Sequence, residues 1–275
     1  MTVRYGSAVN EVASLSSERL PGCSVEHVQV DLRFPDLPPA FDGLRIGMLS
    51  DLHIARRTRT VDALVDWTAA QSVDLWAVTG DVLEGLEGVP QVARIVEVMR
   101  APLGCFAVAG NNDHRCYTLP EGPPALFREV GLPLLDNTHT VLSRGGARVA
   151  LIGVDDPYRA KDDLPRAVEG VDDGLFRVLL AHSPGVVFHA AAAGVRLLLA
   201  GHTHGGQIRL PWVGALMARS GVRGCGRRMA AGAFSVDQVV AYVSRGIGTS
   251  WIALRVFCPP EVTTLRLHRE ERRDA

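Results

Sequence analysis

The chain has 275 residues, 47% of them hydrophobic, which is enough for one globular domain with a large core and excludes a disordered or fibrous protein. Its formal net charge of -1 argues against a nonspecific nucleic-acid binder, which needs a strong basic excess, so we expect no nucleic acid as a partner. The five cysteines are scattered and include no Cys-x-x-Cys pair, so neither a disulfide framework nor a zinc ribbon is indicated, and a reducing cytoplasm suits them.

The N-terminal segment Met1–Gly22 has no continuous apolar core, so it is not predicted to be a signal peptide. No stretch reaches the ~18–20 apolar residues that a membrane-spanning helix needs. We therefore expect a single domain over residues 1–275, located in the cytoplasm and at most peripheral to the inner face of the membrane.

Strands and helices alternate in the first half of the chain. Val25–Leu32 is expected to form an edge strand. Three buried strands should follow, each ending in a polar tip, with an amphipathic helix in each interval. The strands are Leu44–Ser50, Leu75–Thr79 and Cys105–Ala109; one helix carries Val61, Leu64, Val65 and Ala69, and the other carries Val92, Ile95, Val96 and Met99, with Pro90 near its start. The tips at Asp51, Asp81 and Asn111 are 30 residues apart, a spacing typical of consecutive βαβ units.

The second half continues with further buried strands. Two of them end at polar residues: Arg148–Val154 at Asp155 and Phe176–Ala181 at His182. Ser183 and Pro184 are expected to begin a helix that runs through the alanines to Gly194. The remaining predicted strands are Val195–Ala200, Val239–Ser244 and Val262–Leu267, and Arg269–Ala275 is a charged end.

The stretch Gly201-His202-Thr203-His204-Gly205-Gly206 directly follows a predicted buried strand. Two imidazoles one residue apart can face a single point only if the backbone turns sharply there, and the neighbouring glycines permit such a turn. The pattern is that of a metal site, although two solvated loop histidines would give the same short motif.

Five further polar positions share this placement, just past the carboxyl end of a predicted strand. Taken singly, each has an ordinary explanation as a turn residue or a helix cap. Together they favour one crevice, because ligands of open α/β sheets bind beyond the carboxyl ends of the strands. The candidate metal ligands are Asp51, His53, Asp81, Asn111, His182, His202 and His204.

The donor set indicates what the crevice would bind. Four imidazoles, two carboxylates and one amide oxygen suit Mn, Fe, Co or Zn better than Ca or Mg. Seven ligands exceed what one ion usually takes from a protein, so two divalent ions that share a bridging carboxylate fit better.

These residues resemble the calcineurin-like metallophosphoesterases, whose motifs run Asp-x-His, Gly-Asp, Gly-Asn-His-Asp/Glu, His and Gly-His-x-His. The resemblance covers about Leu44 to Gln207, and the flanks are similar to the small bacterial YkuE-like phosphoesterases through Ser50-Asp51-Leu52-His53, Gly201–Ile208 and Ser244–Thr249. It implies an α/β fold of four layers, an αββα sandwich of two mixed β-sheets flanked by helices.

The resemblance also implies roles for the ligands. The first metal ion would be held by Asp51, His53, Asp81 and His204, and the second by Asp81, Asn111, His182 and His202, so that Asp81 bridges. The implied reaction is hydrolysis of a phosphoester or pyrophosphate bond by a hydroxide that lies between the ions.

One position departs from the family pattern. The motif histidine that contacts phosphate and can protonate the leaving group is Asn112 here, and asparagine cannot act as a general acid. Either His114 takes this role, or the enzyme prefers leaving groups that need no proton, such as the phosphate of a pyrophosphate. The second alternative is the one we favour.

A cap over the site is expected from Leu210 to Phe234. This segment combines Trp212, Val213, Leu216 and Met217 with Arg219, Arg223, Arg227 and Arg228. Trp212, Arg227 and Arg228 are the candidate substrate contacts, and they suit a small phosphorylated or lipid-linked substrate, although a solvated surface loop is an equally good interpretation. Relatives of the YkuE-like branch include enzymes that cleave UDP-2,3-diacylglucosamine. Asp155, Asp156 and Arg245 are candidates to support the site by contacting the metal ligands rather than the metal.

Two alternatives remain open at this point: a scaffold of the same fold that has lost its activity, and a DNA-repair nuclease of the same superfamily. The complete ligand set argues against the scaffold, and nothing in the sequence resembles an extended phosphate-tracking stripe.

Overall fold

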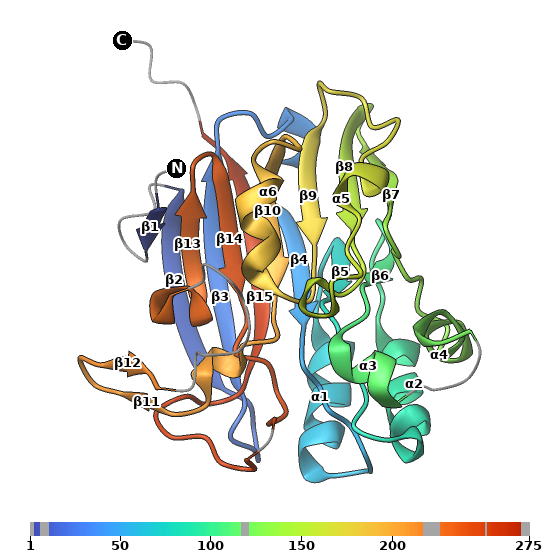
Figure 1. Cartoon of the computed structure of the whole chain (residues 1–275), viewed down its shortest axis with the longest axis vertical. Helices are drawn as coiled ribbons and strands as arrows, with labels where there is room; N and C mark the ends of the chain where they lie inside the picture. Colours follow the sequence, from blue (N-terminus) through green and yellow to red (C-terminus); the bar gives the residue numbers. More distant parts are fainter. Residues whose placement is uncertain (1–2, 6–10, 117–120, 217–225, 251, 271–275) are drawn as a thin grey trace.

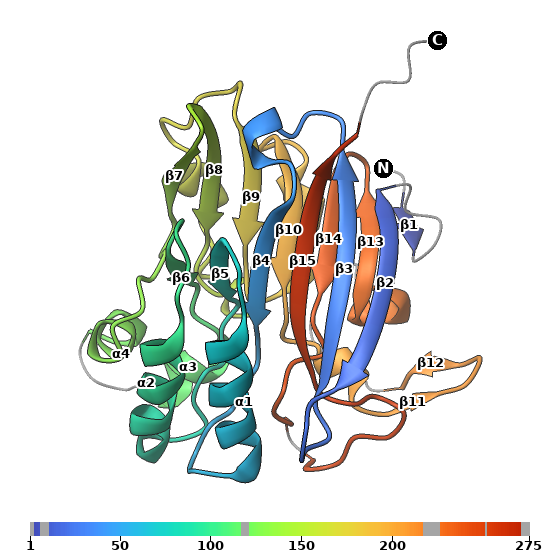
Figure 2. The same ribbon diagram turned by 180° about the vertical axis from the view of Figure 1, so that it is seen from behind.

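The computed structural model describes residues 3–5, 11–116, 121–216, 226–250 and 252–270. Among these residues, strands form two mixed sheets that face each other (Figures 1 and 2). The seven-stranded sheet has the order β1 (Val3–Tyr5), β13 (Gly232–Val236), β14 (Val239–Val243), β10 (Val195–Ala200), β9 (Phe176–Leu180), β8 (Ala147–Gly153) and β7 (Thr138–Arg144). The six-stranded sheet has the order β2 (Val12–Arg19), β3 (Glu26–Phe34), β15 (Glu261–Arg269), β4 (Leu44–Leu49), β5 (Leu75–Val78) and β6 (Cys105–Ala107).

Helices cover the outer faces of both sheets. The six-stranded sheet packs against α1 (Arg59–Ala70), α2 (Val89–Val98) and α4 (Pro123–Glu129), with α3 (Asn111–Cys116) at the end of β6. The seven-stranded sheet packs against α5 (Leu164–Ala167) and α6 (Val187–Ala190). The predicted αββα sandwich is therefore confirmed.

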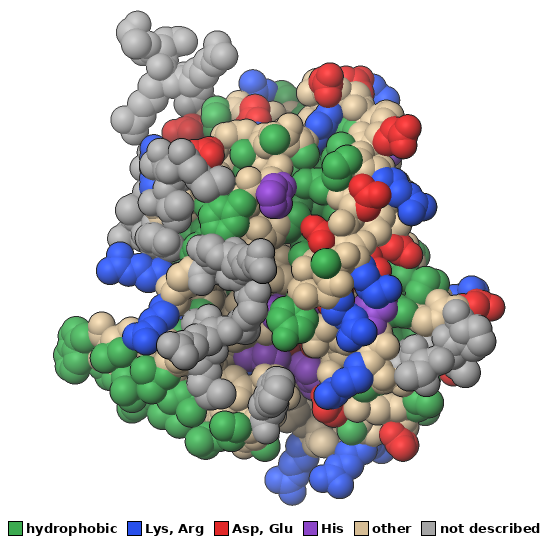
Figure 3. Space-filling view, viewed as in Figure 1, with side chains coloured by type: hydrophobic (Ala, Val, Ile, Leu, Met, Phe, Trp, Pro, Cys, Tyr) green, Lys and Arg blue, Asp and Glu red, His purple; other side chains and the backbone are tan. Residues whose placement is uncertain are grey.

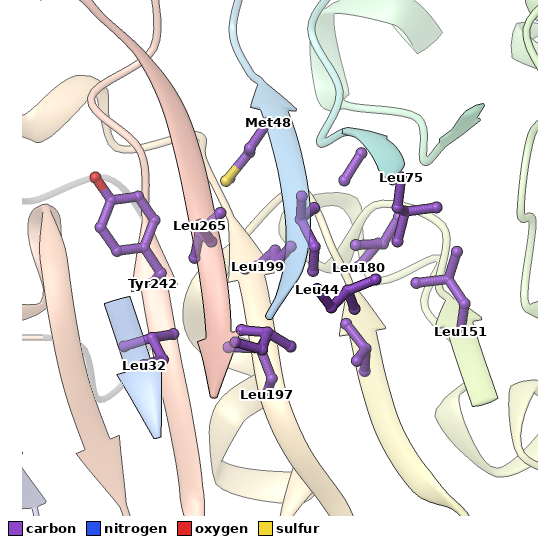
Figure 4. Packing of buried hydrophobic residues seen from close by; sticks show 14 of the residues in the cluster. Leu32, Leu44, Met48, Leu75, Leu151, Leu180, Leu197, Leu199, Tyr242 and Leu265 are labelled. Atoms are coloured by element: carbon purple, nitrogen blue, oxygen red, sulfur yellow. The ribbon is translucent and has the colours of Figure 1, made fainter. Parts of the chain in front are cut away.

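The core between the sheets is apolar and comes from both of them. Leu44, Met48 and Leu265 of the six-stranded sheet meet Leu180 and Leu199 of the other (Figure 4). Burial of such side chains stabilises the packed state by roughly 1.5–3 kcal/mol each. This shared core supports our proposal that residues 1–275 form a single domain.

The predicted βαβ units place the polar tips together. β4, β5 and β6 are parallel neighbours, joined through α1 and α2. Thr58 begins α1 by accepting a hydrogen bond from the Val61 N–H, and Pro90 lies in the first turn of α2. In the other sheet, β9, β10 and β14 are also parallel. The carboxyl ends of both parallel sets therefore lie at one end of the molecule.

Two predictions about secondary-structure elements were wrong. Val25–Leu32 was expected at an edge, but β3 lies inside the sheet and β2 forms the edge. β2 escaped prediction because its serines and charged residues are mostly exposed and give no apolar pattern. The helix after His182 is also short, since it consists of a 3-10 turn, Pro184–Val186, and α6, and Ser183 makes no side-chain cap.

The predicted cap segment is only partly separate from the core. Its end, Gly232–Phe234, belongs to β13, and Met229 and Ala230 are buried. This strand was not predicted, because the small residues around Phe234 give no clear strand pattern. Met217, Arg219 and Arg223 lie outside the described residues. Within the described ranges, no helix is long and apolar enough to cross a membrane.

Candidate metal centre

Carboxylates and imidazoles from both sheets meet at this end of the molecule. One ligating atom each from Asp51, His53 and His204 lies within 4.8 Å of the others. The same is true of Asp51, Asp81 and His182. These side chains follow four different strands, and the parallel registers bring them together.

The two remaining predicted ligands adjoin His182. Its Nε2 atom lies 3.2 Å from Asn111 Oδ1 and 3.2 Å from His202 Nδ1. All seven candidate ligands thus belong to one cluster. Histidine side chains are visible near the centre of the lower part of Figure 3.

The backbone is strained at this cluster. Asp51, His53, Asp81, His202 and His204 all have positive φ angles, between 45° and 69°. Residues with a Cβ atom adopt this region at an energetic cost, which is most often maintained at functional sites. The sharp turn expected at Gly201–Gly206 is therefore present, and it aims both imidazoles inward.

Glycines allow the loops to approach each other closely. A Cβ atom on Gly201 would collide with Ser50 and the Asp51 carboxylate, and one on Gly110 would collide with the Asp81 carboxylate. Only glycine permits these backbones to lie against the carboxylates.

Hydrogen bonds orient the imidazoles. The Thr79 carbonyl accepts from His182 Nδ1 at 2.8 Å, so Nε2 of His182 points toward Asp81. Glu84 accepts from His53 Nδ1 at 2.7 Å. This leaves His53 Nε2, a buried atom without a hydrogen-bond partner in the described structure, facing Asp81 Oδ2 at 3.5 Å. A buried ring nitrogen without a hydrogen-bond partner, beside a buried carboxylate, is what a metal ligand requires.

Asp51 is held just as firmly. Its carboxylate accepts hydrogen bonds from Ser50 Oγ at 2.6 Å and from the His202 backbone N–H at 2.9 Å. Thr79 Oγ1 donates in turn to Ser50 Oγ at 2.7 Å. The hydrogen bond from the His202 N–H to Asp51 ties the loop after β4 to the loop after β10, and therefore one sheet to the other.

The buried carboxylates and imidazoles shift one another's pKa values. Burial alone would raise the pKa of Asp51, but the nearby imidazoles of His204 and His182 lower it overall. Burial would likewise lower the pKa of His182, yet the Asp81 carboxylate raises it well above its ordinary value. Burial lowers the pKa of His204 to about 4, and burial together with the charge of His182 lowers that of His202 to about 3. Two histidines are thus held neutral, which is the ligating form.

Sequence reasoning missed Asp113. Its carboxylate is fully buried and accepts hydrogen bonds from the backbone N–H groups of Asp81, Val82, Leu83 and Gly110. Burial, followed by the charge of Asp81, raises its pKa to about 7, and cations at the site would lower it. The signal was its place as the last residue of the Gly-Asn-Asn-Asp run.

The two candidates for the proton-donor role are held by other groups. The Asn112 amide donates to the Leu83 carbonyl at 3.0 Å and to Glu84 at 2.8 Å. His114 Nε2 lies 2.6 Å from Asp155 Oδ1. Asn112 therefore belongs to the support of His53, and Asp155 positions His114.

The other candidate supporting residues differ in their placement. Arg245 pairs with Glu261 and Glu26. Asp156 is buried and accepts from the Tyr158 N–H at 2.9 Å, and the Tyr158 ring lies 4.7 Å from that of His202. Tyr158 had not been singled out in the sequence, because a single tyrosine in a loop carries no pattern.

The candidate substrate contacts lie on two segments attached to the histidine loop. Thr203 Oγ1 donates to the Ala230 carbonyl at 2.6 Å, which fixes the 3-10 turn Arg227–Ala230 beside the histidine loop. Arg227 and Arg228 are exposed on this turn. Trp212 is fully exposed at the tip of a small hairpin, β11 (Arg209–Leu210) and β12 (Gly214–Ala215).

An αββα sandwich with a cluster of aspartates and histidines at the shared carboxyl ends defines a metal-dependent phosphoester hydrolase. The chain belongs to the calcineurin-like phosphoesterase family, whose model matches residues 44–206. This family uses a dinuclear metal centre.

Curated relatives agree over most of the chain. The uncharacterized metallophosphoesterase YkuE of Bacillus subtilis is 28% identical and covers 88% of this chain and 85% of its own length. The uncharacterized metallophosphoesterase YkoQ of the same organism is 29% identical, with coverages of 82% and 84%. The UDP-2,3-diacylglucosamine pyrophosphatase LpxG of Chlamydia muridarum is 25% identical, with coverages of 97% and 98%.

Proposed function

We propose that this hydrolase acts on a small phosphorylated or lipid-linked substrate and cleaves a pyrophosphate bond, as in a nucleotide sugar such as UDP-2,3-diacylglucosamine. The observation that carries the proposal is the single cluster of seven candidate metal ligands, in which imidazole nitrogens face the carboxylates of Asp51 and Asp81. Its nitrogen and oxygen donors suit Mn, Fe, Zn or Co.

The proposed division of ligands follows the motifs. Asp51, His53, Asp81 and His204 would hold one ion, and Asp81, Asn111, His182 and His202 the other. The short distances among Asp51, Asp81 and His182 also allow Asp51 to approach the second ion. Two ions, when bound, supply an ionised water and neutralise charge on the phosphoryl group.

The residues around the cluster support a leaving group that needs no proton. Asn112 has no acidic proton to give, and its amide is bound to Leu83 and Glu84. The phosphate released from a pyrophosphate bond is a stable anion at neutral pH. An alkoxide leaving group would instead require a general acid.

The surroundings favour a substrate with an apolar part. Trp212 and the arginines of the turn Arg227–Ala230 lie on segments attached to the histidine loop, and we propose them as contacts for the lipid or sugar and for the phosphates. The relative LpxG is named for a substrate of this kind, which supports the choice.

A hydrolysis screen tests the proposal. The protein would be stripped with a chelator, reloaded with manganese, and assayed on nucleotides, nucleotide sugars, lipid-linked pyrophosphates and aryl phosphodiesters. We expect the highest kcat/KM on a lipid-linked pyrophosphate. Equal or higher values on simple monoesters would overturn the substrate assignment, and no hydrolysis under any metal would overturn the proposed site.

A further inference from the structure

Seven large apolar side chains are exposed on two adjacent loops. They are Leu210, Trp212, Val213 and Leu216 of the β11–β12 hairpin and Ile252, Leu254 and Phe257 of the loop before β15, and we call them the apolar platform. Trp212 is 102% exposed and Phe257 is 72% exposed, so both project into solvent. Figure 3 shows hydrophobic side chains gathered over the hairpin, at the same end as the histidines. Exposed apolar groups gathered in this way mark an interaction surface.

Backbone hydrogen bonds join the two loops of the platform. The Arg209 N–H donates to the Val256 carbonyl at 2.9 Å, and the Val256 N–H donates to the Gln207 carbonyl at 2.9 Å. The Gln207 side chain also donates to the Ile252 carbonyl at 3.0 Å. The platform is therefore one unit rather than two independent loops.

The platform is also attached to the metal centre. Gln207 lies three residues after His204. The guanidinium of Arg255, within the second loop, donates to the carbonyls of His204 at 3.3 Å and Arg245 at 2.8 Å. Anything that binds the platform is consequently held next to the site.

Basic residues outnumber acidic ones in this part of the chain, and of these Arg245 is paired with Glu261 and Glu26. From Gly201 to Pro260 the sequence has seven arginines and a single acidic residue, Asp237. Asp237 lies in the turn between β13 and β14, at the amino end of β14 and thus opposite the metal centre. Arg227 and Arg228 are exposed on the site side, and Arg56 and Arg59 are exposed in the loop that leads from β4 to α1.

We propose that the apolar platform docks on an anionic lipid membrane surface. A projecting hairpin with an aromatic tip, a second apolar loop and the exposed Arg227 and Arg228 beside the histidine loop fit the boundary between head groups and acyl chains. A second copy of the chain is a poorer occupant, because a symmetric interface would place the arginines of both copies against each other. The docking depends only on these exposed residues; it extends the proposed function because a lipid-linked substrate resides at the same surface.

Vesicle co-sedimentation of the whole chain tests the inference. We expect binding to vesicles of phosphatidylcholine mixed with phosphatidylglycerol, weaker binding to phosphatidylcholine alone, and loss of the difference at high salt. The double variant Leu254→Ser, Phe257→Ser should reduce partitioning about tenfold, since two apolar anchors are lost. Leu15→Ser is the matched control, because Leu15 is 59% exposed on β2, away from the platform.

Hydrolysis of a soluble aryl phosphodiester separates this inference from the proposed function. The double variant should retain this activity while losing vesicle binding. Unchanged vesicle binding by the double variant would overturn the inference. A second result would also overturn it: the parent binds no vesicles but forms a dimer in sedimentation velocity, and the double variant is a monomer. Vesicle binding by a protein that hydrolyses nothing would overturn the proposed function alone.

Discussion

The backbone N–H of Asp81 donates a hydrogen bond of 2.8 Å to the buried carboxylate of Asp113. The Asp81 carboxylate itself faces His53 and His182, at 3.5 and 3.4 Å. Asp113 thus holds the loop in its strained conformation, while Asp81 faces the other candidate ligands. Replacing Asp113 should therefore affect stability, and replacing Asp81 should affect metal binding.

Replacing the proposed bridging carboxylate should abolish metal loading. Asp81→Asn keeps the shape but removes the charge shared by both ions, so we expect turnover to fall by at least about a hundredfold. Metal content per chain, measured by mass spectrometry after manganese reloading, should fall in parallel. Asp237→Asn, in the distant turn, is the control. A variant with full metal content and full turnover would disprove the bridging role.

Replacing Asp113 should lower the stability of the fold. In Asp113→Asn, one carboxylate oxygen becomes an N–H donor that faces backbone N–H groups. We expect the free energy of unfolding to drop by about 1–3 kcal/mol in denaturant titrations, because buried donors lose their acceptor. The control is Asp66→Asn, an exposed position on α1. Equal stability of Asp113→Asn and the parent would show that the four hydrogen bonds contribute little.

Glu84 should tune metal affinity without being a ligand. Its carboxylate fixes the orientation of His53, so Glu84→Gln should weaken manganese binding by about 10- to 100-fold while leaving the stoichiometry unchanged. Isothermal titration would measure both quantities. Glu87→Gln, three residues further along, serves as the comparison. A change in stoichiometry would instead make Glu84 a ligand.

The role of His114 can be tested with graded leaving groups. If the enzyme prefers leaving groups that need no proton, kcat for aryl phosphodiesters should depend steeply on leaving-group pKa in the parent and equally steeply in His114→Ala. A shallow dependence that becomes steep only in the variant would assign the general acid to His114. Asp155→Asn should then show the same change, because Asp155 holds the imidazole.

His27 gives a pH dependence of stability that is separate from the metal centre. Burial against Trp67 and Thr264 lowers its pKa from the ordinary value of 6.5, despite the opposing effect of Glu18. A pKa lowered in the folded state contributes stability above the unfolded value, and that stability is lost as pH falls below it. Between about pH 7 and pH 5 the free energy of unfolding should therefore decrease more in the parent than in His27→Gln. Parallel pH profiles would contradict this assignment.

The sequence by itself determined the ligand types and most of the elements that carry them. The spacing of Asp51, Asp81 and Asn111 predicted the βαβ units, because periodic apolar residues and strand-end polar residues are local features. The motifs through His204 identified the family for the same reason, and the departure at Asn112 could be noted without coordinates.

Only the tertiary structure decided which groups act on those ligands. Glu84, Asp113, Tyr158 and Arg255 support the cluster through contacts between loops that are distant in the chain or through the backbone, and neither kind leaves a periodic pattern. The apolar platform has the same origin, since Trp212 and Phe257 come from two segments joined by hydrogen bonds at Gln207 and Val256. A sequence lists side chains along one dimension, whereas burial, strain and charge depend on neighbours that only the packing of the two sheets brings together.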